Sequence, residues 1–405
     1  MKIIPAISTK RIAIKLKPAA ERMAKKSHPW VFEDSIIKQN HEGEPGDLAI
    51  IFDSKTNKFL ACGLYDPDSP IRLKLIQFHE SKKIDSDWFK AKIDDAKKLR
   101  RSLLRTDTNS YRFISGENDG FPGLIADVYD NVLVIKLYTH IWFPYFNEIA
   151  ELLISKSGCN TAILRLSRNA QKTSKKLGVK DGQVIHGTLE NENVQFKEHG
   201  IWFTANVIKG HKTGFFLDHR HNRKRIGELA SGNRVLDVFS YAGGFSVHAL
   251  AGGAKSVLSL DISKQALELA KDNAKLNEHA GKHEVLEADA FEGLQKFIEE
   301  KRNFDLIIID PPSFAKSKAE KPRALIAYKR LAQLGVKCTA KNGILVLASC
   351  SSRVLADEFY AICERELTAT GRHYEVIGKT LHDKDHPIGF PEGAYLKCAY
   401  YQFFD

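Results

Sequence analysis

Apolar positions in the first part of the chain form short runs of strand length separated by turns. Such runs occupy residues 12–16, 47–53, 59–65 and 71–76, and the last of them alternates with period two. Alternation of this kind is typical of half-buried strands. The pattern predicts a small β-barrel over residues 1–80.

The pattern changes to helical spacing after residue 84. Trp88, Phe89, Ile93 and Ala96 recur at intervals of three or four within a helix predicted over residues 85–106. Strands are expected at residues 132–138 and 162–166, with a helix between them at 146–155. Gly and Asn residues at 118–123 predict a tight turn between two further strands. Together these segments predict an α+β middle domain over residues 81–195.

Strand and helix patterns alternate in the last part of the chain. Apolar runs at residues 235–239, 256–260, 285–289, 304–310 and 343–350 are separated by helical patterns at 245–250, 264–277 and 324–340. This alternation predicts an α/β fold with a doubly wound parallel sheet, a Rossmann-like domain over residues 196–405. Ligands of such sheets bind at the carboxyl ends of the strands. Polar residues with chemical potential fall at or near those ends: Asp237, Asp261, Asp289, Asp310 and Cys350.

A glycine-containing turn follows the first of these strands. Gly243 and Gly244 form an adjacent pair, whereas a dinucleotide site needs three spaced glycines. The turn and the later Asp261 resemble motif I of class I S-adenosylmethionine-dependent methyltransferases. An acid at the end of the second strand suits ribose hydroxyls. The alternative is a purely structural unit in which Asp261 caps the next helix.

The resemblance implies an S-adenosylmethionine site built from the strand ends and the loop before the first strand. We expect that loop, residues 209–220, to close over the methionine end of the cofactor, and Asp289 to meet the adenine amino group. The expected cofactor-binding residues are Lys212, Thr213, Phe215, Arg220, Asp237, Phe239, Ser240, Tyr241, Gly243, Gly244, Asp261, Ile262, Ser263, Asp289, Ala290 and Asp310.

Two motifs at neighbouring strand ends suggest the chemistry. Asp310-Pro311-Pro312 fixes the backbone directly after a strand and presents a carboxylate to a flat substrate. A similar motif in amino methyltransferases holds the exocyclic amine of a purine. Cys350 favours a different reaction, because carbon 5 of a pyrimidine accepts a methyl group only after a thiolate has added to carbon 6. The expected substrate-binding residues are Pro311, Pro312, Phe314 and Lys316.

Charge and cysteine usage indicate the partner and the compartment. The net charge is +11, and cations cluster in residues 1–26, 165–180 and 316–323, which favours a nucleic-acid partner. The six cysteines contain no C-x-x-C pair, so neither a zinc site nor a disulfide framework is expected. No apolar run approaches the roughly 18 residues of a membrane span. We therefore expect a cytoplasmic protein without a metal.

These motifs together resemble one family over essentially the whole length, the bacterial 23S ribosomal RNA 5-methylcytosine methyltransferases of the large-subunit methyltransferase I type. The segments that carry the resemblance are 28–32 with 59–65, which are similar to a PUA domain, and 116–124, 212–218, 239–245, 310–314, 349–351, 385–387 and 391–393. The family implies a PUA RNA-binding domain, S-adenosylmethionine, Cys350 as nucleophile, Asp310 as the base-binding acid, ribosomal RNA as partner, and a homodimer.

One position departs from the wider group of 5-methylcytosine enzymes. Many of them carry a second cysteine directly after the Pro-Pro motif, where this chain has Ser313 and Phe314. The group that removes the carbon 5 proton is therefore not identified by the sequence. A bound water, Asp310 and, more weakly, His386 are candidates.

The sequence thus predicts S-adenosylmethionine-dependent methylation of carbon 5 of a cytidine in large-subunit ribosomal RNA. An exocyclic-amine RNA methyltransferase is the alternative enzyme. An RNA-binding ribosome assembly factor without catalysis is the alternative of another class. A nicotinamide oxidoreductase is disfavoured because the third glycine is missing.

Overall fold

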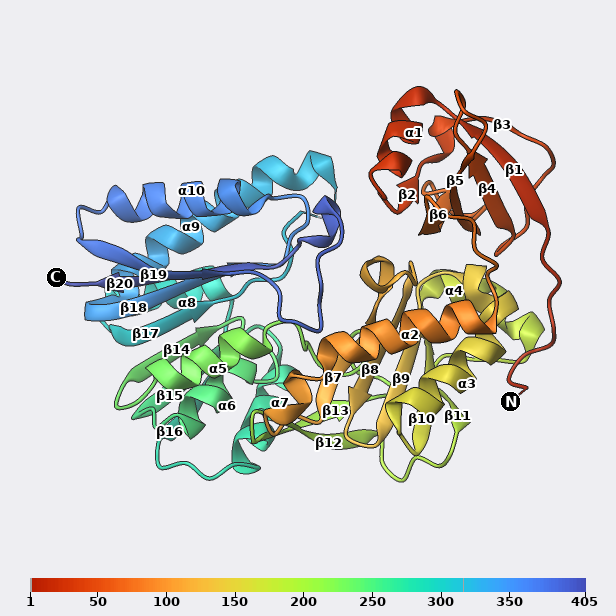
Figure 1. Ribbon diagram of the computed structural model, residues 1–405. Coiled ribbons are helices and arrows are strands. Elements are labelled where there is room, and N and C mark those ends of the chain that lie inside the picture. The colour runs from red at the N-terminus through yellow and green to blue at the C-terminus, as the bar shows by residue number, and fades with distance from the viewer. Residues whose placement is uncertain (1, 316) are drawn as a thin grey trace. The chain divides into compact units, whose positions relative to one another are not determined.

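The computed structural model describes residues 2–315 and 317–405, and the chain divides into two compact units (Figure 1). The first unit comprises residues 1–197, 204–217 and 384–390. The second comprises residues 198–203, 218–383 and 391–405. The chain therefore passes between the units more than once.

The first unit begins with a six-stranded sheet of order β2-β6-β5-β4-β1-β3. Alternating apolar residues of these strands form their own core, with Ile12, Ile14 and Leu16 of β1 facing inward. The elements are β1 (Arg11–Leu16), α1 (Pro18–Lys25), β2 (Trp30–Val31), β3 (Ile36–Gln39), β4 (Leu48–Phe52), β5 (Phe59–Tyr65) and β6 (Leu73–Phe78).

A five-stranded sheet of order β11-β10-β9-β8-β7 forms the rest of the first unit. Helices α2 and α3 pack on it, because Trp88 and Phe89 of α2 and Ile149 of α3 join the strands in one buried core (Figure 1). The elements are α2 (Ser86–Arg100), β7 (Ser110–Ser115), β8 (Leu124–Tyr129), β9 (Val132–Leu137), α3 (Phe146–Ser157), β10 (Thr161–Leu166), α4 (Arg168–Ser174) and β11 (Gln183–His186).

The predicted turn in this region joins β7 to β8. It contains a 3-10 turn over Gly116–Asp119 and a left-handed Gly123 with φ +72°, where a Cβ would meet the Thr139 side chain at 2.9 Å. The Asp119 carboxylate accepts hydrogen bonds from Arg100 and from the amide of Ser115. The motif therefore has a structural role in this hairpin.

Strands β12 (Asn193–Glu198) and β13 (Ile201–Asn206) form a two-stranded sheet where the chain passes between the units. The second unit then contains a seven-stranded sheet of order β16-β15-β14-β17-β18-β20-β19. The first five strands in that order are parallel, and β20 runs antiparallel to both of its neighbours. Parallel strands buried on both faces require continuous apolar runs, as in β17, FDLIII.

Helices cover both faces of this sheet (Figure 1). Helices α8, α9 and α10 share one buried core with the sheet, and α5, α6 and α7 lie on the other face. The elements are α5 (Arg220–Leu229), β14 (Arg234–Val238), α6 (Gly244–Ala251), β15 (Ser256–Asp261), α7 (Lys264–Lys275), β16 (Lys282–Glu287), α8 (Ala290–Glu299), β17 (Phe304–Ile309), α9 (Lys321–Cys338), β18 (Thr339–Ser349), α10 (Ala356–Thr368), β19 (Tyr374–Thr380) and β20 (Lys397–Phe403).

The predicted fold class, a Rossmann-like domain preceded by a small β domain and an α+β domain, is confirmed. Differences are local. The third strand of the second unit, β16, spans Lys282–Glu287 rather than 285–289, because Asp289 caps α8 instead of continuing the strand. Strands β19 and β20 were not predicted, since their polar and apolar residues do not alternate cleanly.

Candidate cofactor and catalytic site

The carboxyl ends of the parallel strands bring the predicted site residues to one edge of the seven-stranded sheet. The chain order reverses between β14 and β17, which makes this the topological switch point where ligands bind. Asp237 lies in β14, Asp261 ends β15, Asp310 follows β17 and Cys350 follows β18. Residues far apart in sequence therefore share one edge.

The turn after β14 has an unusual backbone. Phe239 and Tyr241 adopt positive φ angles of 65° and 46°, and Gly243 has φ 74°. The amides of Phe239 and Ser240 donate to the carbonyl of Leu260 in the neighbouring strand, which fixes the turn. A Cβ on Gly243 would lie 2.8 Å from that of Ala270, so only glycine fits.

Two buried acceptors at this turn have no hydrogen-bond partner. Asp237 is fully buried; its Oδ2 accepts from the amide and hydroxyl of Ser246, while Oδ1 has no partner among the described residues. The Ser240 hydroxyl is also buried without a partner. Burial raises the pKa of Asp237 to about 7. An unsatisfied carboxylate oxygen of this kind fits the ammonium group of an amino-acid ligand.

Asp261 is fixed by two backbone amides. Its Oδ2 accepts from Tyr241 at 2.9 Å and its Oδ1 from Ser263 at 2.9 Å. Each carboxylate oxygen has two lone pairs, so Asp261 can still accept bonds from ribose hydroxyls. Helix α7 is capped by Ser263, whose hydroxyl accepts from the amide of Ala266, and not by Asp261. Ile262 is 72% exposed and offers an apolar surface beside this acid.

Asp289 and Ala290 lie at the start of α8. Asp289 caps this helix through Oδ1, which accepts from the amides of Phe291 and Glu292. Ala290 is buried against the sheet. The cap holds the Asp289 carboxylate after β16, and its role toward adenine stays a prediction.

The loop expected to close over the cofactor is divided between the two units. Lys212, Thr213 and Phe215 belong to the first unit, where the Thr213 hydroxyl bonds to Asp127 at 2.5 Å and to Tyr129 at 3.0 Å. Phe215 is buried and Lys212 is exposed. Their contact with a cofactor stays a prediction.

Arg220 belongs to the second unit and is fully buried. It pairs with Asp383 at 3.0 Å and lies 3.9 Å from Glu198. An arginine held in this way supports the local structure, and its predicted role in cofactor binding is untested.

A buried histidine that the sequence analysis did not single out lies beside Asp310. His219 Nε2 is 3.3 Å from Asp310 Oδ1, at ion-pair distance but without hydrogen-bond alignment. Asn222 Oδ1 accepts from the hydroxyls of Thr380 and Tyr400, so its amide nitrogen is the donor to His219 Nδ1 at 3.0 Å. This arrangement leaves the proton on Nε2, facing Asp310.

The charge state of His219 reflects two opposing effects. Burial disfavours the charged ring, but the neighbouring Asp310 outweighs it and raises the pKa of His219. The only sequence signal for this residue was its place before α5, which also suits a structural histidine. Its position beside Asp310 became visible only in the fold.

Cys350 lies in the turn after β18, next to the Pro-Pro motif after β17. Its Sγ is 3.7 Å from the carbonyl oxygen of Pro311. Cys350 is partly exposed, whereas the other five cysteines are buried. Pro312 is exposed, and Phe314 is half-buried against Tyr328 with a centroid distance of 5.3 Å. Lys316, a predicted substrate contact, lies outside the described residues.

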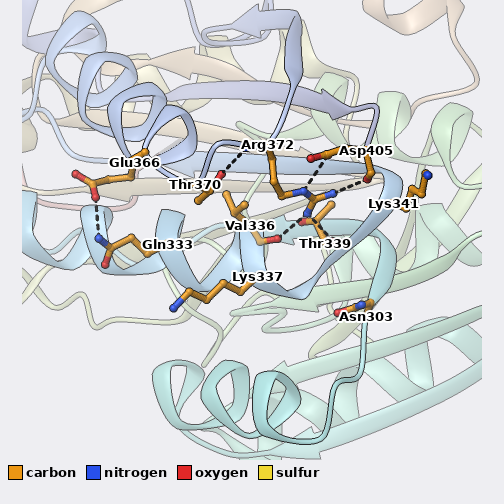
Figure 2. A pocket seen from close by; sticks show the side chains of 11 residues that line it. Asn303, Gln333, Val336, Lys337, Thr339, Lys341, Glu366, Thr370, Arg372 and Asp405 are labelled. Atoms are coloured by element: carbon orange, nitrogen blue, oxygen red, sulfur yellow. Dashed lines mark hydrogen bonds and ion pairs between the residues drawn. The ribbon is translucent and has the colours of Figure 1, made fainter.

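A cavity of about 750 Å³ lies at the opposite edge of the sheet and does not contain the predicted site (Figure 2). Thr339, at the start of β18, and Asn303, just before β17, line it. Arg372 spans its wall, bound to Asp405 and to the carbonyls of Val336 and Thr339 (Figure 2). These groups satisfy one another, so size alone does not identify the functional site.

A cationic surface lies on the first unit, around α4. We call it the α4 surface; it consists of five exposed cations without an acid between them: Arg168, Lys172, Lys175, Lys176 and Lys180. A polyanion can bind such a surface by displacing counterions. The six-stranded sheet and the α4 surface are the candidates for RNA contact.

Two structural findings concern membranes and metals. None of the helices within residues 2–315 and 317–405 has both the length and the apolarity needed to span a bilayer. In the same part of the chain, no three His, Cys, Asp or Glu side chains gather in a way that would hold a metal ion.

Comparison with known proteins identifies both regions. Residues 184–364 match the family of S-adenosylmethionine-dependent methyltransferases, and residues 14–78 match the PUA-like domain. The chain is 44% identical to a "Ribosomal RNA large subunit methyltransferase" of Deinococcus radiodurans over 98% of its length and 99% of the relative's. It is 35% identical to a "Ribosomal RNA large subunit methyltransferase I" of Alteromonas mediterranea, over 94% and 96% of the two chains.

Solved structures share the fold. A SAM-dependent methyltransferase from Streptococcus mutans superposes with a TM-score of 0.81 at 20% identity, covering 97% of this chain and all of the other. A second structure, of a methyltransferase complexed with SAH, gives the same TM-score at 20% identity over 98% of this chain and all of the other.

Proposed function

Because this chain belongs to the family of S-adenosylmethionine-dependent ribosomal RNA large-subunit methyltransferases, we propose that it methylates carbon 5 of a cytidine in 23S ribosomal RNA through a covalent adduct with Cys350. The cofactor is S-adenosylmethionine. The single observation that carries the proposal is the partly exposed Cys350, 3.7 Å from the carbonyl of Pro311 in the Asp310-Pro311-Pro312 turn.

The residues of the second unit fit this cofactor. The unsatisfied Asp237 Oδ1 and Ser240 hydroxyl suit its ammonium group, the remaining lone pairs of Asp261 suit its ribose, and exposed Ile262 offers a surface for adenine. Gly243 and Gly244 at the start of α6 let the backbone approach its carboxylate. When bound, S-adenosylmethionine supplies an electrophilic methyl group.

Cys350 acts on the target base. Its thiolate forms a bond to carbon 6 of cytosine, and the electron pair of the carbon 5–carbon 6 double bond makes carbon 5 nucleophilic. Asp310 is the candidate to bind ring nitrogen 3 or the exocyclic amine as charge develops there. After methylation, loss of the carbon 5 proton restores the double bond and expels the Cys350 thiolate.

His219 contributes by positioning Asp310. Its Nε2 faces Asp310 Oδ1 at 3.3 Å, and Asn222 fixes the ring from the other side. His386, the weaker candidate for the proton acceptor, has Nδ1 2.9 Å from Asp385 Oδ1 within the first unit. We therefore favour a water or Asp310 as the group that accepts the carbon 5 proton.

RNA recognition falls to the first unit in this proposal. The PUA-like sheet and the α4 surface provide a fold and a charge suited to RNA. The target cytidine has to leave its base stack to reach Cys350, which favours loops or incompletely assembled particles. The resemblance to the family also implies a homodimer, and light scattering should then give twice the mass of one chain.

The experiment is nucleoside mass spectrometry of large-subunit ribosomal RNA. The RNA comes from cells lacking this gene and is incubated with labelled cofactor and either wild-type or Cys350→Ala protein. Label in 5-methylcytidine with the wild type alone supports the proposal.

The Asp310-Pro311-Pro312 turn favours one second candidate, methylation of a purine exocyclic amine. Label in a methylated purine that survives Cys350→Ala would establish that reaction instead. Cys350 would then be a structural residue.

A further inference from the structure

Lys397 is a buried lysine beside the turn that carries Cys350. It has 0% exposure and lies at the start of β20, where its Cα pairs with that of Ser349, the last residue of β18. Burying an ammonium group is costly unless hydrogen bonds replace its water shell. The contacts of Lys397 therefore indicate why it is retained there.

The ammonium group of Lys397 binds three backbone carbonyls. Nζ donates to the carbonyl of Ser351, to that of Val354 at 2.5 Å and to that of Tyr395 at 3.1 Å. A neutral amine has only two N–H groups and would leave one carbonyl unsatisfied. The three acceptors thus favour the charged form of Lys397.

Two of these carbonyls belong to the turn directly after Cys350. Lys397 therefore fixes residues 351–354 and carries a positive charge behind the thiol. Burial lowers the pKa of Lys397 to about 8, while Cys350 and Glu358 act in the opposite direction. Glu358 forms a close ion pair with Lys321, at 2.6 Å.

The other titratable groups near the thiol would oppose a thiolate. Asp310 after β17 is negative when ionised, and Tyr328 of α9 is a neutral phenol whose pKa burial raises further. Glu358 of α10 is negative but paired. Lys397 is the buried cation that offsets them.

We propose that Lys397 is a positioning residue for Cys350: its ammonium group holds the turn after β18 and stabilises the cysteine thiolate. This inference rests on the proposed role of Cys350 as the nucleophile. No part of the methyl-transfer reaction is needed to test it, because a thiolate can be detected by its own reactivity.

The test is the pH dependence of alkylation of the folded protein by iodoacetamide. Only the thiolate displaces iodide, and the other five cysteines are buried, so Cys350 is modified selectively and Cys350→Ala gives the background. Wild type is compared with Lys397→Met. The matched control is Lys379→Met, which removes the same charge from β19, where Lys379 pairs with Glu364 at 2.7 Å.

We expect Lys397→Met to move the midpoint of the alkylation profile up by about one pH unit, so that alkylation at pH 7 slows about tenfold. Lys379→Met should leave the profile unchanged. Methyl transfer should fall with the same pH shift in kcat while the cofactor Kd stays constant. An unchanged alkylation midpoint in folded Lys397→Met protein would overturn the inference.

A measurement on wild-type protein keeps the inference testable if Lys397→Met does not fold. The alkylation midpoint of native Cys350 should lie about one pH unit below that of the unfolded chain in the same assay. An equal or higher midpoint overturns the inference. Retention of 5-methylcytidine formation by Cys350→Ala would instead overturn the proposed function, and the alkylation profiles would still report on Lys397.

Discussion

Replacement of Asp237 by Asn should separate protein stability from cofactor affinity. Asp237 is fully buried, and burial raises its pKa to about 7. An aspartate in the unfolded chain has a pKa of about 3.9, so the carboxylate is held at a cost that rises to about 4 kcal/mol above pH 7. Asn keeps the shape and an acceptor for Ser246 but removes the charge.

The sign follows from proton binding. Between pH 4 and 7 the folded protein holds a proton on Asp237 that the unfolded chain has lost, so the free energy of unfolding decreases as pH rises through this window. Between pH 6 and 8 wild type should lose about 1.4 kcal/mol that Asp237→Asn does not lose. Urea unfolding of cofactor-free protein at both pH values measures this difference.

Cofactor affinity should change in the opposite direction. A charged hydrogen bond to the ligand ammonium is worth about 1.5–3 kcal/mol, so Asp237→Asn should weaken binding by roughly 10- to 150-fold. Wild-type affinity should also rise with pH up to about 7, because binding requires the ionised carboxylate. Isothermal titration calorimetry with S-adenosylmethionine measures both effects.

The control is Asp272→Asn on α7, an exposed carboxylate with 69% of its side chain accessible. It should change neither quantity. The reasoning would be refuted if Asp237→Asn bound the cofactor as tightly as wild type and showed the same change in unfolding free energy between pH 6 and 8.

Three further outcomes are expected. His219→Ala should lower kcat by roughly tenfold while His219→Gln retains most activity, and the alanine variant should be destabilised more at pH 6 than at pH 8, because a raised histidine pKa stabilises the fold below about 6.5 and that stabilisation is lost as pH rises; equal urea unfolding losses at both pH values would contradict the ion pair. Neutralising the lysines of the α4 surface should weaken RNA binding and reduce the salt slope of log K by about 0.7–0.9 per lost phosphate contact, with cofactor affinity unchanged; an unaltered slope in filter-binding titrations would remove this surface from the RNA site. Gly243→Ala should cost about 1–3 kcal/mol in thermal unfolding, since φ is +74° and a Cβ would lie 2.8 Å from Ala270, whereas Gly232→Ala, with φ +73° and open space, should cost less; equal losses would rule out the steric clash.

Much of the fold follows from local patterns in the sequence. The strand β17 is recognisable because both its faces are buried, which demands an uninterrupted apolar run. Helix α7 is recognisable from its cap at Ser263 and its apolar stripe. The cofactor turn is recognisable because a positive φ and a close approach to Ala270 require Gly243.

Strands β19 and β20 show where local pattern fails. They pair antiparallel at one end of a parallel sheet, and β20 carries Lys397, a charged residue in a fully buried position. A lysine in a sequence predicts a solvated surface, because nothing local reveals the three carbonyls that surround it. The physical reason is that those carbonyls come from other segments of the chain.

The sequence by itself determined the order of strands and helices, the glycine turn, and the two chemical motifs at Asp310 and Cys350. Only the tertiary structure decided which groups stand behind those motifs: His219 facing Asp310, and Lys397 supporting the turn after Cys350. Secondary structure depends on residues close in sequence, whereas hydrogen bonding and charge inside the fold depend on distances that the packing of remote segments sets.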